Sequence, residues 1–412
     1  MKVYLDNAAT TPLSPSVKKY ITSLLDSFYN PSSTYEAGKE SKRIIEKARD
    51  NVAKFINSDP DEIIFTSGGS ASNTLAIKGY DKANNCTVLY SAISHKSILK
   101  CIADISFSQK IYVDGDGKIN LFILEDILEH CDPKPFVVID YANSEIGTVQ
   151  NVKEIIKLTH SFNGIVYLDC TGSISSIPVN VKELDIDMIG FSGHKIHALK
   201  GCGVLYKKKN IELSPLIYGS QEQGLFGGTE NILGIAAIGK AVENYKYESN
   251  SFNGRDYVWN YIKDNVQDVY IVGSEKDRLK HNLFICVKGI DGEQLMTMLD
   301  VKGIQVSIGS ACNSGNKEPS NTLKEIHLNN EDLNSCIRMT FSGSETIDEL
   351  NYVCDEFKKC VDTLRKFTWN RLLKMMSVKV GDIPVSKYYQ KERNSQEGLL
   401  LSYWKWRLIW RN

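Results

Sequence analysis

The feature that most constrains the fold of this 412-residue chain is an alternation of short apolar runs with longer stretches of helical spacing. The runs are rich in Val, Ile and Tyr and lie at residues 63–65, 87–90, 136–139, 165–168, 188–191 and 204–206. Apolar strands separated by helices are typical of a mainly parallel α/β sheet covered on both faces. Ligands bind such sheets beyond the carboxyl ends of the strands, so we expect functional residues directly after these runs.

A change of pattern near residue 250 predicts a second, smaller domain. From there the chain has longer helical stretches and few apolar runs, at 282–287 and 304–307, with helical spacing again at 348–367. We therefore expect a large domain over residues 16–250 and a small α+β domain made of residues 1–15 and 251–367.

The last segment, residues 368–412, differs in composition from the rest of the chain. From residue 369 onward it holds four of the five tryptophans, and nine Lys or Arg against three Asp or Glu give it a local charge of +6. Aromatic and cationic side chains together suit docking to an acidic protein, a nucleic acid or a membrane surface. We expect instead that this basic aromatic tail packs on its parent domain or frays, and that it carries no catalytic residue.

Overall composition excludes several classes of protein. The formal charge is −1, so no overall field attracts the chain to nucleic acid or to an anionic membrane. No run approaches the roughly 18 apolar residues of a membrane span, and the N-terminus lacks a signal-peptide pattern, so we expect a cytoplasmic protein. The ten cysteines show no CxxC pair and no ligand spacing, which predicts core packing rather than a disulfide scaffold or a metal site.

Lys195 and Asp169 each follow an apolar run. Lys195 closes a Ser-Gly-His-Lys turn, where an amine can form a Schiff base with an aldehyde cofactor. Asp169 ends the run at 165–168, where a carboxylate can face a pyridinium nitrogen and keep it protonated. Each residue also has an ordinary interpretation, as a solvated lysine and as an aspartate that caps the next turn.

The turn Thr-Ser-Gly-Gly-Ser at residues 66–70 joins an apolar run to a helical stretch at 71–80. Its free N–H groups, its hydroxyls and the helix N-terminus are typical of a phosphate site, although a Gly-rich turn is often only a turn. Thr229, in a Gly-Gly-Thr-Glu-Asn loop, offers a further hydroxyl for the phosphate. His95 follows the run at 87–90 and is either structural or a residue that stacks on a planar ring and transfers protons.

Cys312 and Arg338 are candidates for binding and transforming a substrate. Cys312 lies in the small-residue loop 307–316, the one such setting among the ten cysteines, where an exposed thiol can act as a nucleophile and carry a labile sulfur. Arg338 can hold an amino-acid carboxylate with both arms of its guanidinium, or form a surface ion pair.

Taken together, these motifs resemble the NifS/IscS cysteine desulfurases, which have the class V aminotransferase fold. The similarity extends from residue 4 to about residue 367. It rests on these segments: YLDNAATTP at 4–12, NPSS at 30–33, FTSGG at 65–69, SHKSIL at 94–99, SEIGTVQ at 144–150, GFSGHKIH at 190–197, GGTEN at 227–231 and GSACNS at 309–314. The resemblance implies a fold type I pyridoxal-phosphate enzyme, with a mainly parallel seven-stranded sheet in its large domain. It also implies a homodimer with pyridoxal 5'-phosphate at the subunit interface.

The resemblance further implies a role for each candidate residue. Lys195 matches the Schiff-base lysine, His95 the stacking acid/base and Cys312 the cysteine that takes sulfur from L-cysteine as a persulfide. The remaining cofactor positions are Gly69, Ser70, Ser144, Asp169, Ser192, His194 and Thr229, of which Thr229 reaches the phosphate of the partner subunit. Arg338 and Asn143 match substrate-binding positions. Alanine leaves, and the persulfide sulfur goes to an acceptor protein for iron–sulfur cluster assembly or thio-modification.

The chain departs from the family pattern at several positions, and these keep alternatives open. Ser144 and Gly172 replace an asparagine and a glutamine that contact the cofactor, and Phe226 replaces an arginine. One alternative is another class V enzyme, an aminotransferase or a selenocysteine lyase, against which the GSACNS loop argues. The other is a non-catalytic scaffold that keeps the fold and binds sulfur-transfer partners.

Overall fold

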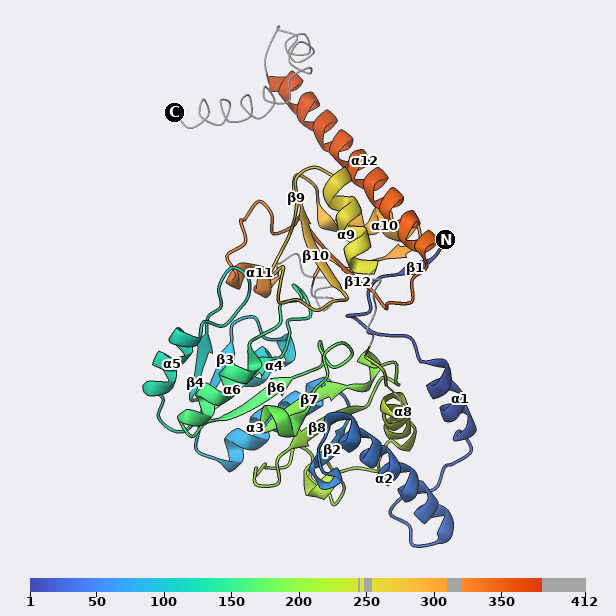
Figure 1. Cartoon of the computed structure of the whole chain (residues 1–412), viewed down its shortest axis with the longest axis vertical. Coiled ribbons are helices and arrows are strands. Elements are labelled where there is room, and N and C mark those ends of the chain that lie inside the picture. The colour runs from blue at the N-terminus through green and yellow to red at the C-terminus, as the bar shows by residue number, and fades with distance from the viewer. Residues whose placement is uncertain (244, 248–253, 310–319, 380–412) are drawn as a thin grey trace. The chain divides into compact units, whose positions relative to one another are not determined.

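The computed structural model describes residues 1–243, 245–247, 254–309 and 320–379, with side chains up to residue 367 (Figure 1). The chain divides into two compact units, Met1–Lys358 and Lys359–Asn412. The three sheets described below all belong to the first unit.

A seven-stranded sheet forms the centre of the first unit, in the order β2-β8-β7-β6-β5-β3-β4. Its strands are β2 (Ile63–Thr66), β3 (Thr87–Ser91), β4 (Ser108–Ile111), β5 (Pro135–Asp140), β6 (Ile165–Asp169), β7 (Met188–Ser192) and β8 (Gly203–Lys207). All neighbouring strands are parallel except the pairs that β8 makes with β2 and β7. The predicted α/β class is confirmed, and each of the six predicted apolar runs lies in a strand.

Helices cover both faces of this sheet (Figure 1). They are α1 (Pro15–Ser23), α2 (Glu36–Ile56), α3 (Gly69–Ala83), α4 (Lys96–Ile102), α5 (Leu121–Glu129), α6 (Val152–Ser161), α7 (Val181–Leu184) and α8 (Ile232–Val242). Successive strand residues face opposite sides: Val137 packs in one buried cluster with α2, α6 and α8, while Phe136 packs in another with α3 and α4. The apolar strands are therefore apolar because both of their faces are buried.

The C-terminal part of the first unit contains a smaller antiparallel sheet in the order β12-β10-β9. Its strands are β9 (Val269–Ile271), β10 (Asn282–Val287) and β12 (Cys336–Thr340), accompanied by the helices α9 (Gly254–Asn265), α10 (Gly292–Val301) and α11 (Asn321–Glu325). The N-terminal strand β1 (Val3–Tyr4) pairs with β11 (Ile304–Gln305) in this part of the chain. That pairing supports the grouping of residues 1–15 with the small domain, whose limits stay a prediction.

The last helix is longer than the sequence pattern indicates. The expected helix ends at residue 367, whereas α12 (Ile347–Lys379) continues for three further turns into the segment treated as the tail. Residues 380–412, which hold Trp404, Trp406 and Trp410, lie outside the described residues, so the interpretation of the tail as a packed or docking segment stays a prediction.

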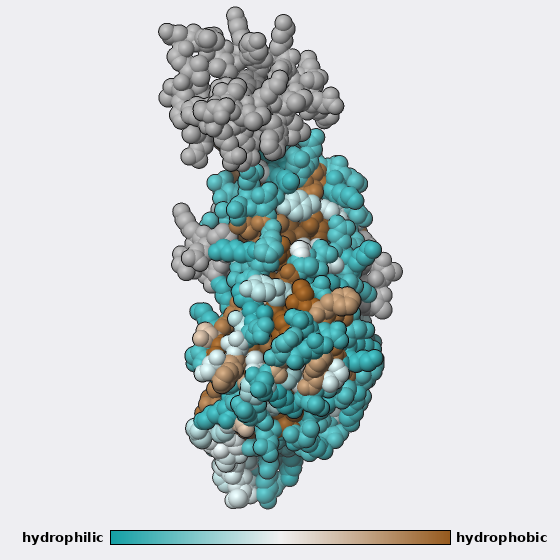
Figure 2. All heavy atoms as spheres, turned by 90° about the vertical axis from the view of Figure 1, so that its left-hand side faces the viewer, coloured by the Kyte–Doolittle hydropathy of each residue, from teal (hydrophilic) through white to brown (hydrophobic). Residues whose placement is uncertain are grey.

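The described cysteines agree with the expectation that most of them pack in the core. Nine of the ten cysteines are described, all as free thiols, and each except Cys131 is buried. Among the described helices, none is both long enough and apolar enough to cross a membrane. Figure 2 shows one face, on which hydrophilic side chains predominate and hydrophobic ones lie in narrow strips between them.

Candidate active site

A cleft of about 150 Å³ lies where the large sheet meets the C-terminal part of the first unit. Its lining includes five residues that the sequence singles out: His95, Asn143, Ser144, Lys195 and Arg338. They come from loops that are far apart in the chain but follow strands, or, for Arg338, lie within one. The expectation that functional residues gather beyond the strand ends is therefore met for this group.

Lys195 is held by the N-terminal segment of the chain. It ends the short helix η2 (Gly193–Lys195), which directly follows β7. Its Nζ donates hydrogen bonds to the carbonyl oxygens of Ala8 and Ala9, the latter at 3.1 Å. The amine is thus oriented by backbone carbonyls, which sequence reasoning misses because a carbonyl gives no residue-specific signal.

Asp169 anchors a buried polar network at the carboxyl end of β6. The side chain is 4% exposed, and its Oδ1 accepts a hydrogen bond from the backbone N–H of Thr171 at 2.8 Å. Its Oδ2 accepts one from Asn73 Nδ2 at 2.8 Å, and Asn73 Oδ1 in turn accepts one from the Tyr167 hydroxyl at 2.5 Å. Gly190 makes room for that hydroxyl, since a Cβ there would collide with it.

His95 caps the N-terminus of α4 with its own ring. Nδ1 lies 3.2 Å from the backbone nitrogen of Ser97 and 2.7 Å from Ser97 Oγ. Asn73 Nδ2 donates to that same Oγ at 2.9 Å, which connects His95 with the Asp169 network. Burial lowers the pKa of His95, with Lys195 and Lys96 acting in the same direction and Asp169 opposing them.

Asp140 is a site residue that the sequence analysis did not name. It ends β5 and is the register partner of Asp169 on β6, so the two carboxyl groups are neighbours. Both of its oxygens lie 3.3 Å from the backbone nitrogen of His95. Burial, and then repulsion by Asp169, raise the pKa of Asp140 to about 8. The signal that located Asp169, an aspartate directly after an apolar run, was present here too.

The start of α3 is shaped to receive an oxyanion. A Cβ at Gly69, the first residue of α3, would lie 2.9 Å from Thr171 Oγ1 and 3.5 Å from the Cβ of Ser192, which shows how close these groups are. Thr171 Oγ1 is buried and has no hydrogen-bond partner in the described part of the chain. Ser70, which follows in the first turn of α3, is exposed. A buried hydroxyl beside a helix N-terminus fits a bound phosphate.

His194 lies beside Lys195 and close to the N-terminal segment. Its Nδ1 lies 3.1 Å from Thr10 Oγ1. Burial, with Lys195 and Lys200 contributing, lowers its pKa to about 4, so the ring is neutral at physiological pH. A neutral imidazole can hydrogen-bond a phosphate without adding a charge.

The other predicted residues that the structure describes do not line this cleft. Gly69, Ser70, Asp169, Ser192 and His194 lie at or next to the ends of the strands of the large sheet. Thr229 is exposed on the loop before α8. Cys312 belongs to residues 310–319, which are not described. The described residues on either side of that segment, Gly309 and Ser320, both lie against Glu145: Ser320 Oγ donates to Glu145 Oε2 at 2.7 Å, and a Cβ on Gly309 would be 2.6 Å from Oε1.

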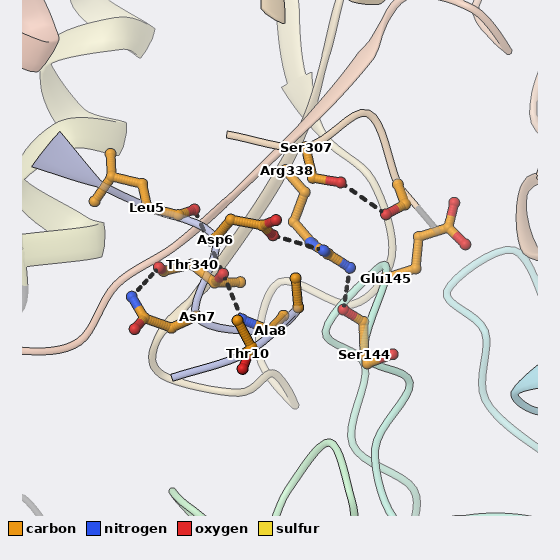
Figure 3. A network of polar contacts seen from close by, with 12 residues as sticks. Leu5, Asp6, Asn7, Ala8, Thr10, Ser144, Glu145, Ser307, Arg338 and Thr340 are labelled. Carbon is orange, nitrogen blue, oxygen red and sulfur yellow. Dashed lines mark hydrogen bonds and ion pairs between the residues drawn. The ribbon is translucent and has the colours of Figure 1, made fainter. Parts of the chain in front are cut away.

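Arg338, in β12, is buried and lines the cleft from the C-terminal part of the first unit, close to Asp6 and Ser144 (Figure 3). The side chain is 3% exposed; its Nη2 pairs with Asp6 Oδ1 at 2.9 Å and its Nη1 donates to the carbonyl oxygen of Ser144 at 3.0 Å. Its Nε is buried without a hydrogen-bond partner among the described residues. The alternative of a surface ion pair is therefore wrong, because the Arg338 side chain is buried and its partner Asp6 is only partly exposed.

Asn143 and Ser144 form part of the wall of the cleft. The Asn143 side chain donates to the Ile93 carbonyl at 2.8 Å, and its Oδ1 accepts from the backbone N–H groups of Glu145 and Ile146. It therefore fixes the loop that carries Ser144. A Cβ at Gly172 would lie 3.2 Å from the Cβ of Ser144. The two residues that replace the asparagine and the glutamine of the family pattern are therefore neighbours in space.

Comparisons with known proteins agree with this arrangement. The family model described as aminotransferase class-V matches residues 3–353. A cysteine desulfurase IscS from Dictyoglomus turgidum is 36% identical over 88% of this chain and 95% of its own, and one from Methanosarcina thermophila is 33% identical over 89% and 93%. The structure of a NifS-like protein from Rickettsia africae matches with a TM-score of 0.81 and 30% identity, covering 88% of this chain and all of that one.

A further solved structure, described as SspA in complex with cysteine, has a TM-score of 0.74 and 28% identity over 84% of this chain. The family match thus spans the large sheet, the cleft and the C-terminal part that carries Arg338. Members of this family depend on pyridoxal 5'-phosphate. The chain therefore belongs to the class V aminotransferase family and, within it, to the cysteine desulfurases of the IscS and NifS kind.

Proposed function

We propose that this cysteine desulfurase converts L-cysteine to L-alanine in the cleft between Asp169 and Arg338, and that Cys312 receives the sulfur. The observation that carries the proposal is the convergence of Lys195, His95 and Arg338 on one cleft, with Asp169 at the strand end behind it. The reaction needs an amine for the Schiff base, an aromatic ring to stack on the cofactor, a cation for the substrate carboxylate and an anion for the pyridinium nitrogen. Lys195, His95, Arg338 and Asp169 are of these types, in that order. The chain brings them together from four separate loops and strands.

The residues fit the cofactor. When bound, pyridoxal 5'-phosphate supplies an aldehyde for a Schiff base and a protonated ring that accepts electrons from the substrate. Lys195 would hold its aldehyde carbon, Asp169 its ring nitrogen and His95 its ring face. The phosphate would be held by Gly69, Ser70, Ser192, His194 and the Thr171 hydroxyl, whose missing partner among the described residues supports this assignment. Ser144, which lines the cleft, would lie beside the ring.

Arg338 would bind the carboxylate of the substrate through its Nε, the buried donor without a protein partner among the described residues. A buried N–H that lacks an acceptor costs about 1–3 kcal/mol, and a substrate carboxylate would recover that cost. Asn143 would act by fixing the loop whose Ser144 carbonyl orients the guanidinium. The carboxylate of the substrate would thus lie at Arg338, with its α-amino group toward Lys195.

In the transfer step, the thiolate of Cys312 attacks the sulfur of the bound cysteine. A sulfur–sulfur bond forms, the carbon–sulfur bond of the substrate breaks, and the carbon retains the electron pair and takes a proton to give alanine. Support for the reach of Cys312 comes from its two described flanks, Gly309 and Ser320, which both contact Glu145 beside the cleft.

We further propose a cytoplasmic homodimer that passes the persulfide sulfur to an acceptor protein, either an iron–sulfur scaffold or a thiolation protein. The names of the IscS relatives support the reaction class, and the free thiols of the nine described cysteines fit a reducing compartment. In such a dimer the exposed Thr229 would serve the phosphate of the neighbouring subunit.

The test compares the purified protein with its Lys195→Ala and Cys312→Ser variants. We expect the unaltered protein and the Cys312→Ser variant to show the visible absorbance band of the lysine Schiff base. The Lys195→Ala variant should lack it. With L-cysteine and a reductant, the unaltered protein should release alanine and sulfide in equal amounts, and Cys312→Ser should release neither. Sulfur or amino-group transfer that survives in Cys312→Ser would indicate another class V enzyme, and a protein without the band even after addition of cofactor would indicate a scaffold.

A further inference from the structure

The ring of His95 has one nitrogen whose hydrogen-bonding role is decided by its neighbours. A neutral imidazole has one nitrogen that donates and one that accepts. The backbone N–H of Ser97 can only donate, and it lies 3.2 Å from Nδ1 of His95. Nδ1 must therefore be the accepting nitrogen, which leaves the hydrogen of the neutral ring on Nε2.

The Ser97 hydroxyl leads to the same assignment independently. Asn73 has its Nδ2 on the Asp169 carboxylate and its Oδ1 on the Tyr167 hydroxyl; turning the amide over would place its oxygen against the carboxylate. Nδ2 therefore also donates its second hydrogen to Ser97 Oγ, at 2.9 Å. The hydroxyl of Ser97 is then free to direct its own hydrogen to His95 Nδ1, 2.7 Å away.

We propose that Ser97 and Asn73 are positioning residues that hold His95 as a neutral imidazole with its hydrogen on Nε2. In this state the ring can stack and donate a hydrogen bond, but Nε2 cannot accept a proton. A proton can add only at Nδ1, where it would displace two donors. This inference rests on the proposed function for its catalytic meaning: with its hydrogen on Nε2, His95 can act at that nitrogen as an acid or a hydrogen-bond donor but not as a base, which leaves the proton-accepting role to another group such as the Lys195 amine.

The charges around His95 favour the same state. The groups that face it are Asp140 from β5, Asp169 from β6, Lys195 from η2 and Lys96 from α4. Burial and the two lysines lower the pKa of the ring, and Asp169 alone raises it. Since the pKa of Asp140 is raised to about 8, that carboxyl holds its proton at neutral pH and adds little negative charge that would favour a protonated ring.

The direct test is nitrogen NMR of the full-length protein labelled with 15N-histidine, recorded with and without cofactor between pH 6 and 8. The chain has seven histidines, and a His95→Gln variant identifies the signals of His95. We expect the shift of a bare nitrogen at Nδ1 and of a protonated nitrogen at Nε2 in both samples. A hydrogen on Nδ1, or a doubly protonated ring at pH 7, would overturn the proposal.

A matched pair of variants tests the positioning role. Ser97→Ala removes the hydroxyl donor to Nδ1 and should raise the pKa of His95 by about one pH unit, the equivalent of one hydrogen bond. Ser97→Thr keeps the hydroxyl and should leave the pKa as it is in the unaltered protein. An unchanged pKa in Ser97→Ala would refute the role of the hydroxyl. Because the nitrogen shifts are measured without turnover, this result is independent of whether the protein proves to be a desulfurase.

Discussion

The two ends of the cleft differ in how completely the protein satisfies its own polar groups. At the Asp169 end, both carboxylate oxygens, both ends of the Asn73 amide and the Tyr167 hydroxyl have hydrogen-bond partners. At the Arg338 end, three buried atoms have none among the described residues: Arg338 Nε, Glu145 Oε1 and Asn7 Oδ1.

This difference shows which contacts are built in and which are left for a ligand. Buried polar atoms are nearly always paired, so each unpaired atom requires an explanation. The side chains around Asp169 are held by hydrogen bonds within the protein and can orient a permanently bound cofactor. The unpaired atoms around Arg338 would be paired only when a substrate binds. Two buried hydroxyls near the first end are unpaired among the described residues: that of Ser94, next to His95, and that of Thr171, which lies beside Gly69, where the cofactor phosphate would bind.

The largest effect is expected from removing the charge at the satisfied end. Asp169→Asn should lower kcat/KM by about 100-fold or more, because an amide cannot hold the ring nitrogen protonated. Asp140→Asn is the matched control: with a pKa of about 8, Asp140 is already neutral at pH 7, so the amide should change the rate by less than about threefold. The measurement is steady-state kinetics at pH 7. An equal loss of activity in both variants would contradict the assignment of Asp169 as the charged and Asp140 as the neutral carboxyl group.

At the unsatisfied end, Arg338→Ala should act mainly on substrate binding. We expect KM for L-cysteine to rise by about 10- to 100-fold, the value of a charge-assisted hydrogen bond, with a smaller change in kcat. Arg338→Lys should raise KM less than Arg338→Ala does, because lysine keeps the positive charge but lacks the planar set of N–H donors of a guanidinium. The cofactor absorbance band checks that the site is intact, and a loss of that band with KM unchanged would refute the assignment.

A smaller effect should follow from trimming the network behind Asp169. Tyr167→Phe removes the hydroxyl that donates to Asn73 and leaves Asn73 Oδ1 buried and unpaired, which should destabilise the fold by about 1–2 kcal/mol. The measurement is the urea midpoint of the cofactor-loaded protein. A midpoint equal to that of the unaltered protein would mean that the network is not fully formed.

The last prediction concerns the pH dependence of stability. Because the folded pKa of Asp140 lies above its unfolded value, its contribution to stability is present in full below about pH 4 and is lost as pH rises to about 8. We therefore expect the urea midpoint of the cofactor-free protein to carry a component that falls over this range and is missing in Asp140→Asn. If the two proteins show the same pH dependence, the raised pKa is refuted.

The sequence predicted the parts of the fold in which apolar pattern and burial coincide. The expected strand at 282–287 has the observed limits of β10, and the six runs of the large sheet were located correctly. Strand β4 was missed because its residues, Ser108–Ile111, lie at the sheet edge and are mostly exposed, so they carry no apolar run. The continuation of α12 to Lys379 was missed because the change of composition after residue 367 was taken as the end of the helix, although Trp369, Leu372, Leu373 and Met376 continue the helical spacing of apolar residues.

For the site, sequence reasoning found the residues whose chemistry is visible in their type. Lys195, His95 and Arg338 are recognisable as reactive or charged groups after strands or in a matching motif. Asn73 and Ser97 were missed because they lie on helices as ordinary polar residues, and only their distances to Asp169 and His95 reveal the connection. The unpaired state of Arg338 Nε is likewise a property of three-dimensional packing.

Gly190 shows how a position that never faces the cleft can affect catalysis. It lies in the interior of β7, and the space above it is filled by the Tyr167 hydroxyl. Even an alanine there would push that hydroxyl away from Asn73 and so loosen the ring of groups that orients the cofactor. A screen for inactive variants should therefore recover substitutions within the sheet itself. Such variants should be recognised by a changed absorbance spectrum of the bound cofactor, even where the substituted residue does not contact the cofactor.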